Sequence, residues 1–173
     1  EGKLLRRAIE ADKVTSLILH GPPGTGKTSL AQIIVNKTAS RFIRINAVSS
    51  GVKELREIIA SSEENLYHYG QKTIVFCDEV HRFNKGQQDV LLPAIEKGII
   101  IFIGATTENP YFALNQALLS RSTVFKLSAL SPEEIRLGLD RALQDKERGL
   151  GNYNTKISTE AFNHWIDHAD GDL

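Results

Sequence analysis

A glycine-rich stretch near the start of the chain has the residue types needed to bind a triphosphate. Residues 21–28 read GPPGTGKT and satisfy the pattern G-x-x-x-x-G-K-[ST] of phosphate-binding loops. Glycines leave room for the backbone to wrap a phosphate with its N–H groups turned inward. Lys27 supplies a positive charge for the β- and γ-phosphates, and the Thr28 hydroxyl is suited to Mg²⁺, which prefers oxygen ligands. The predicted phosphate-binding residues are Gly21, Pro22, Pro23, Gly24, Thr25, Gly26, Lys27, Thr28 and Ser29.

The residues on either side of this stretch agree with that interpretation. The apolar run 17–19 precedes it and is typical of a strand, while residues 29–35 follow with helical apolar spacing. A phosphate held by the loop would therefore meet the N-terminus of a helix, where unpaired backbone N–H groups favour anions. The alternative is a chance glycine-rich turn, and the strand–loop–helix context argues against it.

Two neighbouring carboxylates form the second candidate site. Asp78 and Glu79 follow the continuous apolar run 73–77, which predicts a central parallel strand buried on both faces. Ligands gather at the carboxyl ends of strands in open α/β sheets. We expect Asp78 to hold the Mg²⁺ shell and Glu79 to polarise a water for attack on the γ-phosphate. The alternative is a solvated acidic pair that ends a strand.

Polar residues at two further places could complete such a site. Thr106 and Thr107 directly follow the predicted strand 99–105, so a hydroxyl there could reach the γ-phosphate or its attacking water. Spacing alone is weak support, because threonine is common in strands. Arg121 follows a short helix and is either a surface arginine or an arginine finger delivered to the nucleotide of a neighbouring subunit.

Composition limits the possible classes of protein. Lys plus Arg equal Asp plus Glu at 21 each, so bulk charge gives no argument for nucleic acid, and any such contact needs a local patch. No apolar run approaches the ~20 residues of a membrane span, and the first residues lack a secretory layout. A single cysteine, Cys77, suits a reducing compartment. We expect a cytoplasmic protein without membrane contact and, because methionine is absent, a fragment of a longer one.

The elements that must position these residues alternate along the chain. This alternation predicts an α/β fold, a three-layer domain with a five-stranded parallel sheet. The expected strands are 15–20, 41–46, 73–77, 99–105 and 122–128. The expected helices are 3–12, 27–39, one that begins after Gly51, 85–97 and one near 114–120, with 61–70 as a frayed helix end or a loop.

The pattern changes at Ser131. Residues 131–134 read SPEE, a capping box with proline at the first helical position. Only helices are expected beyond this point, over 131–148 and about 159–169. We therefore place a domain boundary at 129/130, with an α/β core over 1–129 and an all-α segment over 130–173.

Two remaining features are interpreted as structural. Tyr111 and Phe112 follow Pro110, and we expect them to pack over the sheet edge rather than to form a loop that contacts a partner. His164 and His168 are spaced i, i+4 as metal ligands can be. No third ligand is evident in the sequence, so an ordinary helix is the preferred interpretation.

Taken together, the motifs resemble those of a known family. The phosphate loop, the Asp78–Glu79 pair, GATTENP at 104–110 and ALLSR at 117–121 are similar, in order and spacing, to the AAA+ ATPases of the clamp-loader branch. DEVHRFNKGQQD at 78–89 together with IGATTENP resembles more closely the RarA/MgsA family of bacterial replication-associated ATPases, related to the Werner helicase-interacting protein. RINAVSSGVKE at 44–54 is most similar to the bacterial form. The resemblance covers nearly the whole chain.

This resemblance implies roles for individual residues. Lys27 and Thr28 would hold the phosphates and Mg²⁺ of ATP, with Asp78 in the metal shell and Glu79 as activator of water. The family pattern implies three further roles. They concern Thr107 as the sensor-1 residue with Thr106 as the register alternative, Arg121 acting in trans across a subunit interface, and Asn46 holding Glu79 inactive until a partner binds.

The resemblance also implies an activity and partners. A DNA-associated ATPase of replication-fork maintenance and recombination is expected, hydrolysing ATP at subunit interfaces, with DNA stimulation in the full-length oligomer. Expected partners are DNA (single-stranded, ends or forks), a single-strand DNA-binding protein and further copies of the chain, as a tetramer through regions outside these residues. The alternatives are a clamp-loader subunit, a RuvB-like branch-migration motor, or a nucleotide-sensing scaffold that hydrolyses little.

Two departures from the family pattern bear on this expectation. ADGDL at 169–173 resembles the start of the sensor-2 motif GDxR and stops before its arginine. The N-terminal segment that contacts adenine in the family has no counterpart in the sequence. The expected unit is thus an ATPase core with a partial helical lid, which binds nucleotide weakly and hydrolyses it poorly.

Overall fold

The computed structural model describes residues 3–153, 155, 157–169 and 171. Residues 1–2 lie outside the described residues. So do residues 170, 172 and 173 of ADGDL, the predicted start of the sensor-2 motif. The chain divides into two compact units, one of Glu1–Gly21 with Lys27–Lys126 and one of Pro22–Gly26 with Leu127–Leu173. Each unit is considered by itself, and the boundary at 129/130 stays a prediction.

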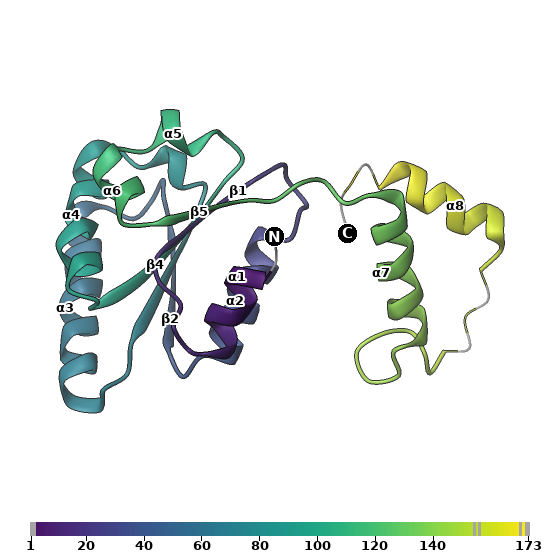
Figure 1. Cartoon of the computed structure of the whole chain (residues 1–173), viewed down its shortest axis with the longest axis horizontal. Helices are drawn as coiled ribbons and strands as arrows, with labels where there is room; N and C mark the ends of the chain where they lie inside the picture. Colours follow the sequence, from purple (N-terminus) through teal and green to yellow (C-terminus); the bar gives the residue numbers. More distant parts are fainter. Residues whose placement is uncertain (1–2, 154, 156, 170, 172–173) are drawn as a thin grey trace. The chain divides into compact units, whose positions relative to one another are not determined.

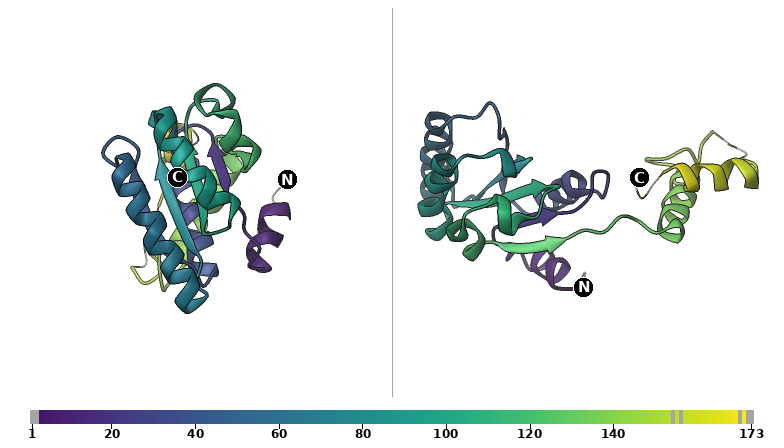
Figure 2. Two further views of the ribbon diagram at one scale, coloured as in Figure 1. Left: turned by 90° about the vertical axis from the view of Figure 1, so that its left-hand side faces the viewer. Right: turned by 90° about the horizontal axis from the view of Figure 1, so that it is seen from above.

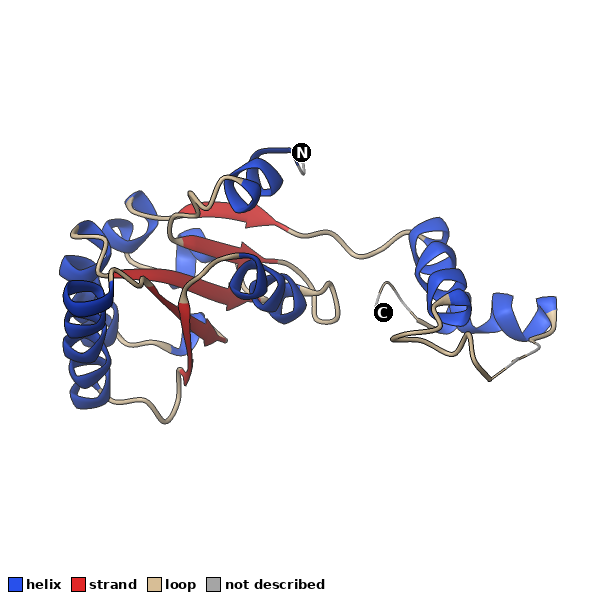
Figure 3. Cartoon of the chain, turned by 90° about the horizontal axis from the view of Figure 1, so that it is seen from below, coloured by secondary structure: helices blue, strands red, loops and turns tan. Residues whose placement is uncertain are grey.

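A five-stranded sheet forms the centre of the first unit (Figure 3). The strands are β1 (Leu17–His20), β2 (Arg41–Asn46), β3 (Thr73–Asp78), β4 (Ile100–Thr106) and β5 (Thr123–Lys126). Their order is β2-β3-β4-β1-β5, and every neighbouring pair is parallel. The predicted α/β fold with a five-stranded parallel sheet is confirmed.

Helices cover both faces of this sheet, as parallel strands require. They are α1 (Lys3–Glu10), α2 (Lys27–Lys37), α3 (Val52–Tyr69), η1 (Val80–Arg82), α4 (Lys85–Glu96), α5 (Pro110–Ala113) and α6 (Gln116–Ser120). Figure 1 shows α3 and α4 on one face and α1 and α2 on the other, and the two views of Figure 2 agree. The carboxyl ends of the strands therefore form one edge between two helical layers.

The core lies around the two central strands. All seven residues of β4 are buried, and β3 is buried up to its last residue, Asp78. Phe76 and Phe102 are fully buried, one from each strand. Gly104 is packed so closely that a Cβ there would lie 3.0 Å from Ile18 Cδ1 and from Val80 Cγ1. This packing fixes the ends of β3 and β4, where the candidate residues lie.

Helix α3 corrects one expectation. The sequence predicts a frayed end or loop over 61–70, yet the helix continues to Tyr69. Ser62 is fully buried and donates to Ile58 O at 2.7 Å, which ties the polar segment to the preceding turn. Gly70, with a φ of 65°, then ends the helix in the left-handed conformation that glycine adopts easily.

Two exposed aromatic residues correct a second expectation. Tyr111 is 66% exposed and Phe112 is 91% exposed, so neither packs over the sheet edge. The inward positions of this segment are taken by Pro110 and Leu114, which are buried. A four-residue helix such as α5 has too little length to turn further side chains toward the core.

The second unit contains two helices, α7 (Pro132–Gln144) and α8 (Thr159–His168). The predicted capping box is present, with Ser131 Oγ accepting from Glu134 N at 3.3 Å and Glu134 Oε2 accepting from Ser131 N at 2.9 Å. Helix α7 ends before the expected residue 148, because Asp145 Oδ1 accepts from the Glu147 and Arg148 amides and forms a turn. A small cluster of Ile135, Phe162 and Ile166 holds the two helices together.

Candidate nucleotide-binding site

The glycine-rich stretch connects β1 to α2, as its flanking sequence predicted. Its first residue, Gly21, donates its backbone N–H to Thr106 O at 3.2 Å, which joins the start of the loop to the end of β4. Within the loop, Gly24 and Gly26 have φ values of 73° and 80°. These left-handed conformations favour glycine and let successive N–H groups face one side. Thr25 Oγ1 donates to Pro22 O at 2.9 Å and closes the turn.

Lys27 begins helix α2 and is only 8% exposed. Its Nζ donates to Gly21 O at 2.9 Å, so the ammonium group lies over the start of the loop. Thr28 and Ser29 follow in the first turn and are exposed. The backbone N–H groups of a first helical turn have no partner within the helix, which makes this terminus a favourable position for an anion.

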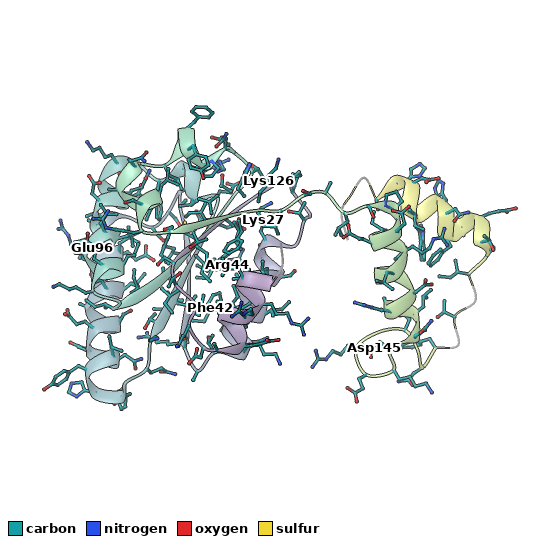
Figure 4. The ribbon with its side chains drawn as sticks, viewed as in Figure 1. Lys27, Phe42, Arg44, Glu96, Lys126 and Asp145 are labelled. Atoms are coloured by element: carbon teal, nitrogen blue, oxygen red, sulfur yellow. The ribbon has the colours of Figure 1, made fainter. Side chains whose placement is uncertain are left out.

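Asp78 ends β3 and lies opposite Asn46 in the register of the sheet. Its Oδ1 accepts from the Glu79 amide at 3.0 Å. Its Oδ2 lies 3.6 Å from the guanidinium of Arg44, which also lies over the Phe76 ring at 5.9 Å from its centroid. Sequence reasoning missed Arg44, although strand alternation places residues 42, 44 and 46 on one face of β2. Figure 4 labels Arg44, Phe42 and Lys27.

Glu79 has an unusual backbone. Its φ of 51° and ψ of 44° are left-handed values that a residue with a side chain adopts at a cost. The Glu79 carboxylate is paired with Arg82, with 2.9 Å between Oε2 and Nε, and both side chains are about half exposed. The predicted activator of water thus has a cation as its immediate neighbour.

Two threonines lie at the end of β4, Thr106 as its last residue and Thr107 directly after it, and their surroundings differ. Thr106 is 1% exposed, and its hydroxyl lies 3.0 Å from His81 Nδ1 and accepts from the Glu108 amide at 3.0 Å. Thr107, the next residue, is exposed. Sequence reasoning also missed His81, although it stands two residues after Glu79 in the motif DEVHRF.

Asn46 forms no hydrogen bond with Glu79. Its Oδ1 accepts from the Val48 amide at 2.8 Å and from the Ser49 amide at 3.3 Å, so the side chain closes the turn after β2. The register places Asn46 beside Asp78, one residue from Glu79. The structure therefore brings Asn46 to the acidic pair, but its amide is used locally.

Arg121 lies apart from the other candidate residues. It follows α6 and precedes β5, which runs parallel to β1, whereas the glycine-rich loop follows β1. Arg121 and the loop are therefore at opposite ends of the sheet. Its guanidinium pairs with Glu96 and also donates to Ala117 O at 2.8 Å. Figure 4 shows Glu96 on the far side of the sheet from Lys27.

The groups in the first unit suit a magnesium nucleotide. Lys27 supplies an ammonium group, Thr28 a hydroxyl and Asp78 a carboxylate, and oxygen ligands of this kind are those that Mg²⁺ prefers. Burial and the neighbouring Asp78 raise the pKa of the Cys77 thiol to about 12, so Cys77 offers no thiolate ligand. No cluster of three metal-ligating side chains occurs in the described part of the chain, and His164 and His168 form none.

A parallel sheet with a glycine-rich loop after β1 and an acidic pair after β3, with β4 between these two strands, defines a P-loop nucleoside triphosphatase. Residues 17–129 match the ATPase family associated with various cellular activities. The chain belongs to this AAA family, so it is a member of a family of nucleotide-binding ATPases.

Curated relatives show which members of the AAA family the chain is similar to. The chain is 55% identical over 159 residues to Replication-associated recombination protein A of Escherichia coli strain K12, covering 92% of this chain and 35% of that protein. It is 50% identical to the Haemophilus influenzae protein of the same name, with 99% and 38% covered. ATPase WRNIP1 of Dictyostelium discoideum is 51% identical over 141 residues, with 82% and 16% covered. The predicted resemblance to the RarA family is confirmed, and the chain spans less than two fifths of these relatives.

Solved structures confirm the fold. The RuvB Holliday junction branch migration motor of Thermotoga maritima has a TM-score of 0.76 at 24% identity, covering 99% of this chain and 55% of that one. A second solved form of the same RuvB protein has a TM-score of 0.78 at 26% identity, with 98% and 56% covered. In the part of the chain that the structure describes, no helix is long and apolar enough to cross a membrane.

Proposed function

We propose that this chain is the ATP-hydrolysing core of a DNA-associated AAA ATPase that acts in replication-fork maintenance and recombination. One observation carries the ATPase part. The loop after β1, the acidic pair after β3 and the threonines after β4 lie at one edge of the sheet, and the Gly21–Thr106 hydrogen bond joins two of them. Ligands of α/β sheets bind at this edge.

The proposed roles follow from the chemistry of each group. The loop, Gly21 to Ser29, holds the phosphates, with Lys27 neutralising charge on the β- and γ-phosphates. Thr28 and Asp78 hold Mg²⁺, which when bound stabilises the developing charge on the phosphate oxygens. Glu79 accepts a proton from the attacking water, and the exposed Thr107 hydroxyl orients the γ-phosphate or that water. The buried Thr106 hydroxyl already has partners, which favours Thr107 in this role.

Binding and hydrolysis can be tested separately. Calorimetry with ATPγS and Mg²⁺ measures binding to the 173-residue chain, and turnover is measured on the full-length protein. Lys27→Ala should abolish detectable binding, while Glu79→Gln should keep the dissociation constant and lower kcat by about 10²–10⁴-fold. Lys37→Ala, at the other end of α2, is the matched control. Normal binding by Lys27→Ala would contradict the proposed site.

The DNA-linked part of the proposal rests on the relatives. They are named for replication-associated recombination, and we propose that the full-length protein is cytoplasmic, assembles as a tetramer, and works on DNA together with a single-strand DNA-binding protein. Turnover with and without single-stranded or forked DNA, with the oligomer mass measured alongside, tests this. Turnover that is unchanged by either DNA would contradict DNA stimulation.

A branch-migration motor is the second candidate, because the RuvB likeness extends over almost the whole chain. A clamp-loader subunit has the same ATPase core, and a nucleotide-sensing scaffold would bind ATP without turnover. Movement of a synthetic four-way junction would favour the motor, and ATP-dependent loading of a ring-shaped clamp would favour the clamp loader. Binding of ATPγS with no turnover under any DNA condition would favour the scaffold.

We also propose that residues 1–129 form the ATPase core and 130–173 part of its helical lid. The family match over 17–129 and the change to an all-helical segment support this division. A fragment of residues 1–129 should fold with the secondary structure of the first unit. Loss of its cooperative thermal unfolding would contradict the boundary.

A further inference from the structure

A histidine links the two loops that carry the proposed chemistry. His81 belongs to η1, the short turn after Glu79, and its side chain is only 12% exposed. Its Nδ1 lies 3.0 Å from the Thr106 hydroxyl at the end of β4, and its Nε2 lies 3.6 Å from the Glu108 carboxylate. One side chain thus contacts both residues that flank Thr107.

The tautomer of His81 sets the direction of its contact with Thr106. The Glu108 amide donates to Thr106 Oγ1 at 3.0 Å, and the single hydroxyl hydrogen of Thr106 has two acceptors in reach, His81 Nδ1 at 3.0 Å and Glu108 O at 3.4 Å. Donation to His81 Nδ1 makes Nε2 the protonated nitrogen, and Nε2–H then faces the Glu108 carboxylate. The other neutral tautomer would direct the Nε2 lone pair at a carboxylate. At 3.6 Å the Glu108 contact exceeds hydrogen-bond length, so Thr106 provides the main anchor.

These contacts connect residues that are distant in sequence and adjacent in the proposed mechanism. His81 lies two residues after Glu79, and Thr106 lies one residue before Thr107. The η1 turn is short, because Arg82 N donates to Glu79 O at 2.9 Å and Phe83 N donates to Val80 O at 3.0 Å. A shift at the end of β4 therefore moves His81, and a shift of His81 changes the turn that holds Glu79.

We propose that His81 is a positioning residue, which transmits occupancy of the γ-phosphate position from the loop after β4 to the carboxylate of Glu79. This inference rests on the proposed ATPase function. His81 itself does not touch the substrate. Its imidazole keeps the Glu79 turn and the Thr107 loop in one fixed relationship, so the water-activating group is aligned when the γ-phosphate is present.

Three variants isolate this role in the full-length protein. His81→Phe fills the same space without ring nitrogens, and Thr106→Val removes the partner hydroxyl at nearly constant volume. Each should lower kcat about 10- to 100-fold, because small displacements of a positioned group have effects of this size, while the dissociation constant for ATPγS changes less than about twofold. His81→Asn keeps an acceptor near the Nδ1 position and should recover part of kcat. His68→Phe, an exposed histidine of α3, is the control.

The double variant separates coupling from general damage. His81→Phe and Thr106→Val remove the same contact, so together they should cost little more than either alone. If the fall in kcat of the double variant equals the product of the two single falls, the two residues do not act through one shared contact. A large fall in melting temperature for His81→Phe but not for Thr106→Val, with kcat falling only in the first, would assign His81 a purely structural role.

Hydrogen exchange gives a readout that does not depend on turnover. In the wild-type protein, the amides of residues 79–84 should exchange more slowly with ATPγS than with ADP. His81→Phe should bind both nucleotides and lose this difference over residues 79–84. The amides of residues 106–109 should still exchange at different rates with the two nucleotides. A difference that the His81→Phe variant retains over residues 79–84 would overturn the proposed coupling and leave the proposed ATPase function standing. Absence of ATPγS binding by the wild-type protein would overturn the proposed function and this inference with it.

Discussion

The guanidinium of Arg121 is paired with the carboxylate of Glu96, and this pair lies at the end of the sheet opposite the glycine-rich loop. An arginine so placed cannot serve the nucleotide of its own chain, which is the geometry that action in trans requires. The Glu96 contact keeps Arg121 at the surface, with 34% of its side chain exposed.

We propose that Arg121 acts in trans, and this role predicts complementation between two inactive variants. In the full-length protein, Arg121→Ala should lower turnover by about 10³–10⁵-fold, the range known for arginine fingers, and Lys27→Ala should be inactive because it binds no ATP. Mixed oligomers of the two should recover activity, because an Arg121 from one subunit meets an intact loop in the next. Lys97→Ala, an exposed cation near Glu96, should behave as wild type. Mixtures as inactive as each variant alone would contradict action in trans.

The ion pair between Glu79 and Arg82 predicts a mild restraint on turnover. Removing Arg82 leaves the carboxylate free to bind water, and exposed pairs of this kind contribute about 0.2–1 kcal/mol. Arg82→Ala should therefore raise basal kcat about two- to fivefold in the full-length protein, without change in nucleotide affinity. Lys85→Ala removes a nearby exposed cation and serves as control. A fall in kcat would show that Arg82 assists the reaction instead.

Crowding at Gly104 predicts a stability effect. An added Cβ would lie 3.0 Å from both Ile18 Cδ1 and Val80 Cγ1 in the centre of the sheet, and overpacking of this kind costs about 1–3 kcal/mol. Gly104→Ala should lower the free energy of unfolding by that amount in urea titration. Gly86→Ala lies in helix α4 with room for a methyl group, its nearest atom being 3.4 Å away, so it should be neutral or slightly stabilising. Equal stability of the two variants would contradict the packing described for β4.

The single cysteine should be unreactive in the folded chain. Burial, assisted by Asp78, raises the pKa of the Cys77 thiol from 9.0 to about 12, so the reactive thiolate is scarce at about pH 8. A thiol reagent such as DTNB should label the native protein very slowly and the protein in about 6 M guanidinium completely. Because the folded pKa is the higher one, the free energy of unfolding should fall as pH rises above about 9. Rapid native labelling at about pH 8 would contradict the buried position.

Local patterns predicted most of the sheet. The alternation over 41–46 predicts β2, because side chains of a strand point to opposite faces in turn. The continuous apolar run over 73–77 predicts β3, because a strand buried on both faces needs apolar side chains at every position. Helix α3 was underestimated because its second half has a polar face, and the burial of Ser62 depends on neighbouring elements. The exposure of Phe112 likewise depends on Pro110 and Leu114 occupying the inward positions.

The candidate site was predicted as a set of residues and not as a set of contacts. The glycine-rich loop and the acidic pair have sequence signatures, since their chemistry demands fixed residue types at fixed spacing. The left-handed conformation of Glu79 has no such signature, because tertiary packing sets it. The His81–Thr106 contact joins positions 25 residues apart, so it follows only from the adjacency of β3 and β4.

The parallel pairing of β1 with β5 has a consequence for symmetry. If Arg121 completes the nucleotide site of a neighbour, each subunit donates from one end of its sheet and receives at the other. A two-fold dimer can complete both sites only with its two sheets antiparallel, whereas subunits with their sheets in the same direction make heterologous contacts that form a ring or an open arc. A closed ring would complete every site, whereas an open arc would leave its terminal site unfinished. The number of fast sites per particle would therefore report whether the assembly is closed.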